Sequence, residues 1–440
     1  MHWRGRTCLP GRCVPTSLGE RIPSNVSGRA APEWAKRNIV TAHILYIGGE
    51  DHDLRIPFML LLRKRGFRVT AAGSGDPTPF TRAGLDFHRF TFKRFVSPLA
   101  DLIAIRDLAA LLAEVRPDFA QTCDTKPNFL VPLAGRQLPG LHVIRNINGR
   151  GWLYSSQSPA ALALRPVYRT LHRMAAGCTA KTIFEIRDDQ AFFEHHKLIG
   201  GGGSLIIPGA GIDVGGFDRA LAQAPSRSQL RNQLGLETCD VVMTVSRLTR
   251  QKGISTLLEA ASQVCEARPK TRFLLVGPRE TEGRLAVSQA EIDGYAPHVI
   301  AIGARSDVPA LLRIADVFAF PTEYREGVPR VLLEAALAET PIVTTSMPGC
   351  CDVISDGWNG FRVPPRSPRA LAERILEMLR DRSAAARMAA RARALVREKF
   401  SLHAVVDRYV ALYTELIARR GDGPATARPA GIFDAEAGSI

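Results

Sequence analysis

The sequence predicts an α/β protein with two domains, each built on a parallel sheet. Short apolar runs alternate with helical patterns in both halves of the chain, which is typical of parallel sheets. The length of 440 residues suits two domains of about 150–200 residues with tails. An apolar content of 45% is enough for the cores of two such domains.

Strand and helix patterns alternate through the first half of the chain. We expect strands at 43–47, 68–72, 119–122, 142–146 and 178–184. We expect helices at 54–65, 99–114, 128–137 and 171–176. Gly48 and Gly49 follow the first strand, where they indicate either a plain tight turn or a ligand-binding loop.

The second half of the chain repeats the alternation. We expect strands at 240–246, 273–277, 299–303, 317–320 and 341–345. We expect helices at 254–266, 308–315, 370–379, 382–400 and 403–418. The same pattern on both sides of the region 214–236 places the boundary between the two domains there.

The segment 324–336, with the sequence YREGVPRVLLEAA, is the centre of the second half. A loop leads into a helix, and Pro329 suits the first helical turn because its missing N–H costs nothing there. The backbone amides around Gly327 and Val328 would point outward from a positive helix terminus. Such amides suit a phosphate or a sugar hydroxyl.

Two acids in this segment allow two interpretations. Glu326 lies in the loop, and Glu334 lies in the apolar run VLLEAALA of the helix. A carboxylate in an apolar run is costly unless something pairs with it. The two acids are therefore either an exposed loop acid and a solvated helix position, or two contacts to one ligand.

Two cations mark the start of the second domain. Arg247 ends the strand 240–246, and Lys252 opens the helix 254–266. Two cations placed in this way can grip a diphosphate jointly with the helix amides. Taken singly, each is more often a solvated loop charge.

Two loops in the first half are candidates for binding a second ligand. The loop 124–128 contains Lys126, and the loop 146–151 contains Asn148, Gly149 and Arg150. Both follow predicted strands, and ligands in open α/β sheets collect at the carboxyl ends of strands. Ordinary turn chemistry explains the Asn-Gly pair equally well.

The charge of the chain indicates an anionic partner. The net charge is +15, and +11 of it lies in residues 1–215. A membrane surface, a diphosphate or a nucleic acid would fit such a balance. The segment 87–95, FHRFTFKRF, includes Arg94 and is either an amphipathic edge strand or a basic aromatic patch that contacts a membrane.

Targeting and redox signals are weak. No apolar run reaches the roughly 18 residues of a membrane-spanning helix. The first residues lack the apolar core of a secretory signal. The eight cysteines are scattered without a CxxC pair, which favours reduced cytosolic thiols over a disulfide framework or a zinc site.

These motifs together resemble a known enzyme family. Glu326 and Glu334, with the EGVP loop, resemble the paired-glutamate motif of retaining GT-B glycosyltransferases of family four. The stretch SRLTRQKG around Arg247 and Lys252 resembles the diphosphate-binding element of that family. The resemblance implies two Rossmann-like domains that face each other across a cleft, with a C-terminal helix that crosses back to the first domain.

The loops of the first half resemble those of the branch that glycosylates polyprenyl-diphosphate-linked sugars. The chain departs from members that carry a His here, because Asn148 and Gly149 occupy the loop. The resemblance implies a retaining transfer of a hexosyl or N-acetylhexosaminyl group from a nucleotide-sugar, and a UDP-sugar is the expected donor. The acceptor would be a polyprenyl-diphosphate-linked sugar or another glycan.

The resemblance also assigns roles to residues. Glu326 would orient the donor sugar, Glu334 would hold the ribose, and Arg247 with Lys252 would stabilise the leaving diphosphate. Further donor-binding positions are Gly48, Gly49, Arg305, Gly327, Val328 and Pro329. The acceptor-binding positions are Arg94, Lys126, Asn148, Gly149 and Arg150. No metal site and no cofactor is expected, since the nucleotide-sugar is a substrate.

Five segments follow from this interpretation. We expect a disordered extension at 1–38, an acceptor domain at 39–215, a donor domain at 216–396, a crossover helix at 397–420 and a loose tail at 421–440. The expected partners are the donor, a lipid-linked glycan acceptor and an anionic membrane surface, without nucleic acid. The expected location is peripheral, on the cytoplasmic face of the inner membrane.

Other functions remain open at this point. A GT-B sugar-nucleotide epimerase would share the fold, although the paired glutamates favour transfer. A nicotinamide-dependent protein is disfavoured, because no GxGxxG follows the first strand. A non-catalytic membrane- or nucleic-acid-binding protein would explain the charge but not the two-domain alternation.

Overall fold

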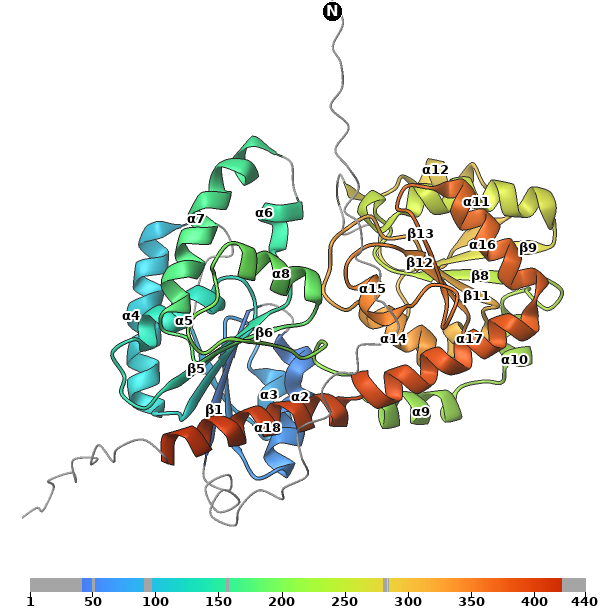
Figure 1. Cartoon of the computed structure of the whole chain (residues 1–440). Coiled ribbons are helices and arrows are strands. Elements are labelled where there is room, and N and C mark those ends of the chain that lie inside the picture. The colour runs from blue at the N-terminus through green and yellow to red at the C-terminus, as the bar shows by residue number, and fades with distance from the viewer. Residues whose placement is uncertain are drawn as a thin grey trace, which may run out of the picture.

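The computed structural model describes residues 42–49, 52–90, 97–155, 158–279, 283 and 285–421. Two α/β domains lie side by side, and a long C-terminal helix runs from the second to the first (Figure 1). The first domain has a seven-stranded sheet and the second a six-stranded sheet, and all strand pairs in both are parallel. The predicted fold class is confirmed. The predicted extension 1–38, most of the tail 421–440 and Arg94 lie outside the described residues.

The first sheet has the order β3-β2-β1-β4-β5-β6-β7. Its strands are β1 (His43–Gly48), β2 (Arg68–Gly73), β3 (Asp86–Arg89), β4 (Phe119–Thr122), β5 (His142–Ile147), β6 (Lys181–Phe184) and β7 (Ser204–Ile206). Its helices are α2 (Ile56–Lys64), α3 (Thr78–Arg82), α4 (Pro98–Val115), α5 (Pro127–Gly135), α6 (Gly151–Ser155), α7 (Pro159–Ala176) and α8 (Arg187–His195). The strand order reverses between β1 and β4, which opens a crevice at their carboxyl ends.

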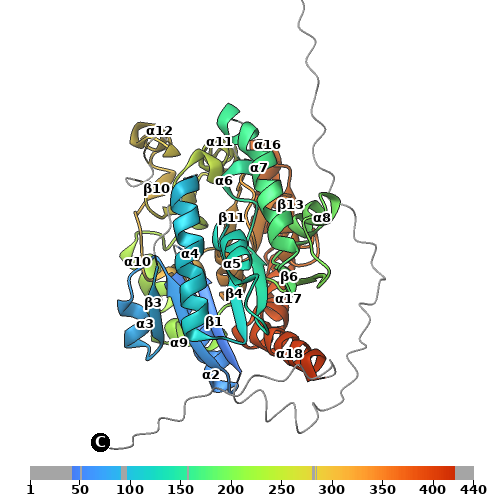
Figure 2. The same ribbon diagram turned by 90° about the vertical axis from the view of Figure 1, so that its left-hand side faces the viewer.

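Helices cover both faces of the first sheet. Every residue of β1 is buried, as expected for a central strand of a parallel sheet. Helices α4, α5 and α7 cover one face, which Figure 2 shows in front. The predicted edge strand of the aromatic segment is β3, and residues 91–95 of that segment lie outside the described residues.

The second sheet has the order β10-β9-β8-β11-β12-β13. Its strands are β8 (Asp240–Val245), β9 (Thr271–Val276), β10 (Val299–Ala301), β11 (Val317–Phe320), β12 (Ile342–Thr345) and β13 (Phe361–Val363). Its helices are α9 (Val214–Gln223), α10 (Arg227–Gln233), α11 (Ile254–Ala267), α12 (Gln289–Asp293), α13 (Val308–Ile314), α14 (Arg330–Leu337), α15 (Cys350–Val353), α16 (Pro368–Arg380) and α17 (Arg382–Leu395). A π-helical turn, Val396–Phe400, then leads into the last helix.

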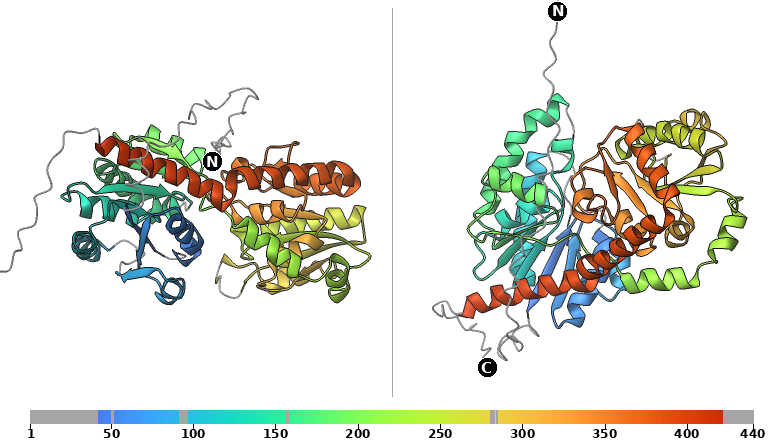
Figure 3. Two further views of the ribbon diagram at one scale, coloured as in Figure 1. Left: turned by 90° about the horizontal axis from the view of Figure 1, so that it is seen from below. Right: turned by 45° about the vertical axis from the view of Figure 1, so that its right-hand side comes forward.

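The last helix, α18 (Leu402–Gly421), completes the first domain (Figure 3). Its side chains Tyr409, Leu412 and Tyr413 are buried in the same cluster as residues of β1, α2 and β4. The Tyr409 hydroxyl donates to Asn146 Oδ1 at 3.0 Å, and the Tyr413 hydroxyl donates to Gln121. The predicted crossing of the C-terminal helix onto the first domain is therefore confirmed.

The two chain crossings between the domains are bonded to each other. Ile212 and Ser401 form a parallel bridge. The Ile212 amide donates to the Phe400 carbonyl at 2.9 Å, and the Leu402 amide donates to the Ile212 carbonyl at 2.8 Å. Gly211 has φ +78°, and a Cβ there would lie 2.7 Å from the Leu402 Cα. Close packing of the two crossings therefore requires glycine at position 211.

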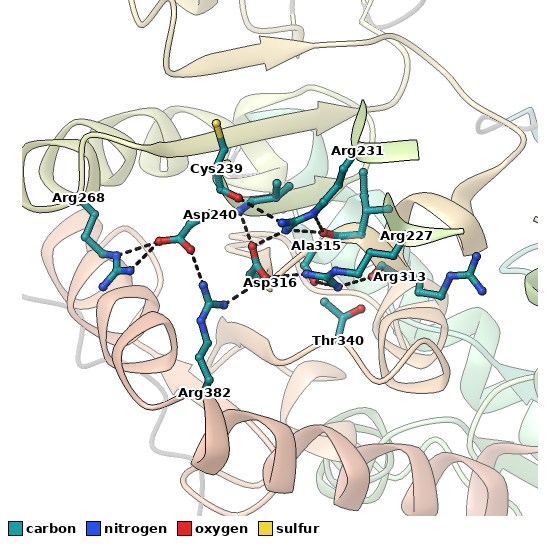
Figure 4. Close-up of polar contacts among 12 residues, drawn as sticks. Arg227, Arg231, Cys239, Asp240, Arg268, Arg313, Ala315, Asp316, Thr340 and Arg382 are labelled. Carbon is teal, nitrogen blue, oxygen red and sulfur yellow. Dashed lines mark hydrogen bonds and ion pairs between the residues drawn. The ribbon is translucent and has the colours of Figure 1, made fainter. Parts of the chain in front are cut away.

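A group of charged residues ties together the amino ends of the second sheet (Figure 4). The Asp316 carboxylate accepts hydrogen bonds from Arg227 (2.7 Å), Arg231 (2.6 Å) and the Val241 amide (2.7 Å), and Arg382 lies 3.3 Å away. Asp240 binds Arg382 and Arg268. We name this group the Asp316 cluster: Arg227, Arg231, Asp240, Arg268, Asp316 and Arg382. It fixes α10, α11 and α17 to β8 and β11, away from the carboxyl ends of the strands.

Candidate active site

Two predicted catalytic residues meet at the carboxyl end of the second sheet. Lys252 ends a 3₁₀ turn (Arg250–Lys252), and Gly253 behind it has φ +71°. A Cβ on Gly253 would lie 1.9 Å from the Pro321 carbonyl oxygen, so glycine lets this turn pack against the loop after β11. As a result, Lys252 Nζ lies 2.7 Å from Glu326 Oε2.

The surroundings hold this ion pair in place. Glu326 Oε1 accepts a hydrogen bond from the Thr322 hydroxyl at 3.1 Å. Lys252 Nζ also lies 5.5 Å from the centre of the Phe320 ring, within the range of a cation–π contact. The two side chains are 12% and 22% exposed. The pair is therefore oriented before any substrate arrives.

Glu334 has a protein partner on its own helix. Arg330 Nε donates to Glu334 Oε1 at 3.0 Å, one turn apart in α14. The carboxylate is 20% exposed, so Glu334 is neither fully buried nor freely solvated. Pro329 was expected in the first helical turn, but α14 begins at Arg330 and Pro329 is the extended residue before it. Pro329 is extended, with φ −67° and ψ 114°, and leads directly into the helix. Because proline has no N–H, it adds no amide donor that would need a partner there.

The remaining donor-side residues lie in neighbouring loops. Arg247 is exposed two residues after β8. Arg305 follows β10, and its guanidinium forms two hydrogen bonds with Asp307, at 2.8 and 2.7 Å. The Gly49 amide donates to Asp124 Oδ2 at 2.7 Å and thereby links the loops after β1 and β4. Gly48, the last residue of β1, packs against Cys123 and His52.

A buried carboxylate of the first domain contacts the EGVP loop. Glu185 follows β6 and is 6% exposed. A Cβ on Gly327 would lie 2.4 Å from Glu185 Oε2, and the Val328 amide donates to the Glu185 side chain. Burial raises the pKa of Glu185, while Arg55, 3.5 Å away, opposes that shift. The loop predicted to hold the donor sugar is thus covered by an acid from the other domain.

The predicted acceptor loop 146–151 lies against this contact. The Asn148 backbone carbonyl would lie 3.0 Å from a Cβ on Gly327. With the Asn148 amide oriented so that its oxygen faces Arg55, Arg55 Nη2 lies 2.6 Å from that oxygen. Asn148 and Gly327 therefore bring the predicted acceptor and donor loops together.

Arg150 joins the same region through two acids at the start of α8. Its Nε donates to Asp189 Oδ1 at 2.8 Å, and its Nη2 donates to Asp188 Oδ2. Arg325 of the second domain donates to the same Asp188 oxygen at 2.7 Å. A pocket between the domains is lined by Gly149, Arg150, Tyr154, Ile186, Asp188, Asp189, Arg325, Glu326 and Pro348.

Lys126 differs from the other predicted acceptor residues. It is 8% exposed, and its Nζ lies 2.5 Å from Asp101 Oδ1 of α4. Its charge is therefore neutralised beside α4 rather than presented to the pocket.

Several residues of the site were missed in the sequence. Glu185, Asp188 and Asp189 directly follow a strand that was predicted to end at Phe184, so position alone could have indicated them. Arg325 precedes Glu326 and could have been considered with it. Arg55 gave no signal, because its partner Glu185 is 130 residues away.

Within the described part of the chain, no three His, Cys, Asp or Glu side chains lie close enough together to hold a metal ion. No helix of that part is long and apolar enough to span a membrane.

Comparison with known proteins agrees with this two-domain site. The family described as "Glycosyl transferase 4-like domain" matches residues 59–188, and "Glycosyl transferases group 1" matches residues 226–395. Each match falls in one of the two domains, in the order that the resemblance implies. The chain is a GT-B glycosyltransferase of family four. The expected enzyme class is thus confirmed.

Two relatives cover much of this glycosyltransferase. One is the N,N'-diacetylbacillosaminyl-diphospho-undecaprenol alpha-1,3-N-acetylgalactosaminyltransferase of Campylobacter jejuni, 25% identical over 84% of this chain and 97% of that protein. Another is the UDP-Gal:alpha-D-GlcNAc-diphosphoundecaprenol alpha-1,3-galactosyltransferase of Escherichia coli, 25% identical over 62% of this chain and 69% of that protein.

The crystal structure of Anabaena HepE in complex with UDP shares the fold. It is 21% identical, with a TM-score of 0.68, over 85% of this chain and all of that one.

Proposed function

We propose that this glycosyltransferase transfers a hexosyl or N-acetylhexosaminyl group from a UDP-sugar to a polyprenyl-diphosphate-linked sugar, with retention of configuration. The observation that carries the proposal is the match to the Campylobacter jejuni enzyme, which extends over 97% of that protein and is named for a diphospho-undecaprenol acceptor. The Escherichia coli relative is also named for such an acceptor. The reaction would be one step in the synthesis of a cell-surface polysaccharide or glycan.

The donor end of the cleft has the charges that this reaction needs. As the glycosidic bond to the nucleotide breaks, negative charge develops on the leaving diphosphate. Lys252, oriented by Glu326, and Arg247 would stabilise that charge without reorganising at the moment of reaction. UDP is the proposed nucleotide because the Escherichia coli relative is named for UDP-Gal and HepE binds UDP.

The donor sugar would lie beside the EGVP loop. Glu326 lies in this loop, and Glu185 accepts the Val328 N–H. A hydroxyl oxygen of the donor sugar can accept the same hydrogen bond. The position of the Glu185 carboxylate oxygen therefore indicates where that hydroxyl would bind. Glu334, held by Arg330 in α14, would receive the ribose.

The proposed acceptor places the enzyme at the inner face of the cytoplasmic membrane. The first turns of α4 expose three apolar side chains: Leu99 (79%), Leu102 (65%) and Ile103 (56%). They follow directly on the basic aromatic segment 87–95, in the half of the chain with a net charge of +11. Apolar side chains beside cations are the two components of interfacial binding.

A transfer assay tests the proposed reaction. A panel of UDP-sugars is offered with an undecaprenyl-diphosphate-linked N-acetylglucosamine and, in parallel, with the same sugar on a soluble aglycone. We expect transfer to the lipid-linked acceptor. NMR of the product should show an α linkage when the donor sugar is α-linked. Equal transfer to the soluble sugar, or inversion at the anomeric carbon, would contradict the proposal.

Liposome flotation tests the membrane surface. We expect binding to vesicles that contain anionic lipid, with each basic residue near the surface contributing on the order of 1 kcal/mol, and loss of binding in high salt. Replacing Leu99, Leu102 and Ile103 together by Ser should weaken binding, whereas Leu162→Ser on α7 is the matched control because Leu162 is also exposed (44%). Binding that ignores both lipid charge and the α4 substitutions would rule this surface out.

A further inference from the structure

Two arginines from different domains meet at a single carboxylate oxygen. Arg150 of the first domain and Arg325 of the second both donate to Asp188 Oδ2, the latter at 2.7 Å. With Asp189 these residues form a group that we name the Asp188 cluster: Arg150, Asp188, Asp189 and Arg325. An anionic oxygen at the position of Asp188 Oδ2 would receive hydrogen bonds from both domains.

Arg150 has contacts that hold it in position independently of Asp188. The Arg150 guanidinium is 12% exposed, lies 4.6 Å from the centre of the Phe192 ring and binds Asp189, which is 5% exposed. The backbone of Arg325 is held next to Glu326, which binds Lys252, while its side chain is 36% exposed and extends to Asp188. Asp188 itself is 38% exposed, so its side chain has room to rotate into solvent.

The pocket beside this cluster has an unused hydrogen-bond donor. Tyr154 lines the pocket together with both arginines. Its hydroxyl is buried and has no hydrogen-bond partner within the described residues. Leaving a buried hydroxyl unpaired is unfavourable, and a ligand oxygen in the pocket would remove that cost.

We propose that this pocket binds the diphosphate of the acceptor, with a phosphate oxygen replacing Asp188 Oδ2 between Arg150 and Arg325. This rests on the proposed function and assigns Arg325, on the donor domain, to the acceptor. The planar guanidinium fork matches phosphate geometry better than an ammonium does. Rotation of Asp188 into solvent removes one negative charge from the pocket as the diphosphate enters.

The position of Arg325 couples the two substrates. Arg325 points to the first domain, while its neighbour Glu326 points to Lys252 in the donor site. The acceptor diphosphate and the donor sugar would therefore contact adjacent residues of one loop. Binding of the acceptor would hold the domains together at the place where the sugar is transferred.

Farnesyl diphosphate is a soluble probe for this pocket, and its binding to the full-length chain can be followed by calorimetry. We expect Arg325→Ala to weaken binding about 10- to 100-fold, the loss typical of a charge-assisted hydrogen bond. Arg325→Lys should recover part of the loss. Arg369→Ala is the matched control, because Arg369 is 86% exposed and is paired with Glu373 on α16.

Asp188→Asn separates binding from a purely structural role. If Asp188 occupies the place of a phosphate, its neutralisation leaves farnesyl diphosphate binding equal or tighter. If the arginines serve only to tie the domains together through Asp188, then Asp188→Asn and Arg325→Ala weaken binding alike. The second result, or an unchanged affinity in Arg325→Ala, would overturn the proposal.

Two further arms identify the source of the diphosphate. UDP should not displace farnesyl diphosphate from the pocket. Displacement by UDP, together with weaker UDP binding in Arg325→Ala, would assign the pocket to the donor instead and overturn the proposal. Hydrolysis of the UDP-sugar in the absence of acceptor reports on the donor site alone, so a failure of the proposed transfer is distinguishable from a failure of this pocket.

Discussion

The Asp316 cluster and the Asp188 cluster lie at different ends of the parallel sheets. In both, one aspartate gathers two or more guanidinium groups. Asp316 is 13% exposed, lies within one domain and also accepts a backbone amide of β8. Asp188 is 38% exposed and connects two domains by side chains alone. Aspartate and arginine thus form a structural scaffold in the Asp316 cluster, where a backbone amide also holds the acid. They form an exchangeable contact in the Asp188 cluster, where only side chains hold it.

The largest effect on turnover is expected at Lys252. Like the Asp188 cluster, Lys252 lies at the carboxyl end of a sheet, in this case the second one. Lys252→Ala should lower kcat about 100-fold or more, because the leaving diphosphate loses a few kcal/mol of stabilisation. The measurement is steady-state transfer together with the melting temperature. Arg250→Ala in the same turn is the control, since Arg250 is 60% exposed and binds Glu291. Near-normal turnover in Lys252→Ala would refute this role.

Removing the carboxylate of Asp316 should affect stability rather than activity. Asp316→Ala leaves Arg227 and Arg231 without their acid and is expected to lower the free energy of unfolding by about 3 kcal/mol. Urea denaturation measures this, with Asp188→Asn as the comparison. We expect Asp188→Asn to change the unfolding free energy by less than about 1 kcal/mol, as for exposed ion pairs. Equal losses in the two variants would mean that the clusters do not differ in kind.

A smaller effect is expected from pH. Burial raises the pKa of Asp189 to about 6, opposed by Arg150, with Asp188 and Arg325 also nearby. As pH rises through about 6, Asp189 loses its proton, and its negative charge then opposes a bound diphosphate. The affinity for farnesyl diphosphate should therefore fall between pH 5 and pH 7 in the unaltered chain. This fall should be about three-fold larger than the fall in Asp189→Asn. The ionisation of the probe is common to both and cancels. Parallel pH profiles would contradict this.

The smallest expected effect is that of a chelator. We propose that Arg247 and Lys252 supply the positive charge that a divalent metal supplies in other transferases, so excess EDTA should leave transfer unchanged. Activity lost in EDTA and restored by magnesium or manganese would show that cations of the protein are not sufficient.

Regular elements were predictable because each depends on local pattern. Strands β4 and β11 have the residues that were predicted for them, and α11 and α18 differ by a few residues at their ends. Helices α8, α9 and α10 were not predicted. Helix α9 begins with Val214 and two glycines, and α8 begins with Arg187 and two aspartates, so neither has the continuous apolar period of a typical helix.

The site was predictable only in part, for a physical reason. The residues of the Lys252–Glu326 pair lie in motifs, and each motif indicated a ligand separately. Their direct ion pair depends on Gly253 packing against Pro321, which no local pattern encodes. The contacts of Glu185 with Val328 and of Asp188 with Arg325 depend on how the domains dock. Residues that meet only across a domain boundary carry no mutual signal in a single sequence.

The crossing of α18 has a consequence for synthesis of the chain. The first domain is made early, yet its core lacks Tyr409, Leu412 and Tyr413 until α18 has been synthesised. The strands and most helices of the second domain form one continuous stretch, so this domain can fold first on the ribosome. At ordinary elongation rates the N-terminal sheet waits on the order of 10 s with an open apolar face. This order of folding makes chaperone protection most important for the half that emerges first.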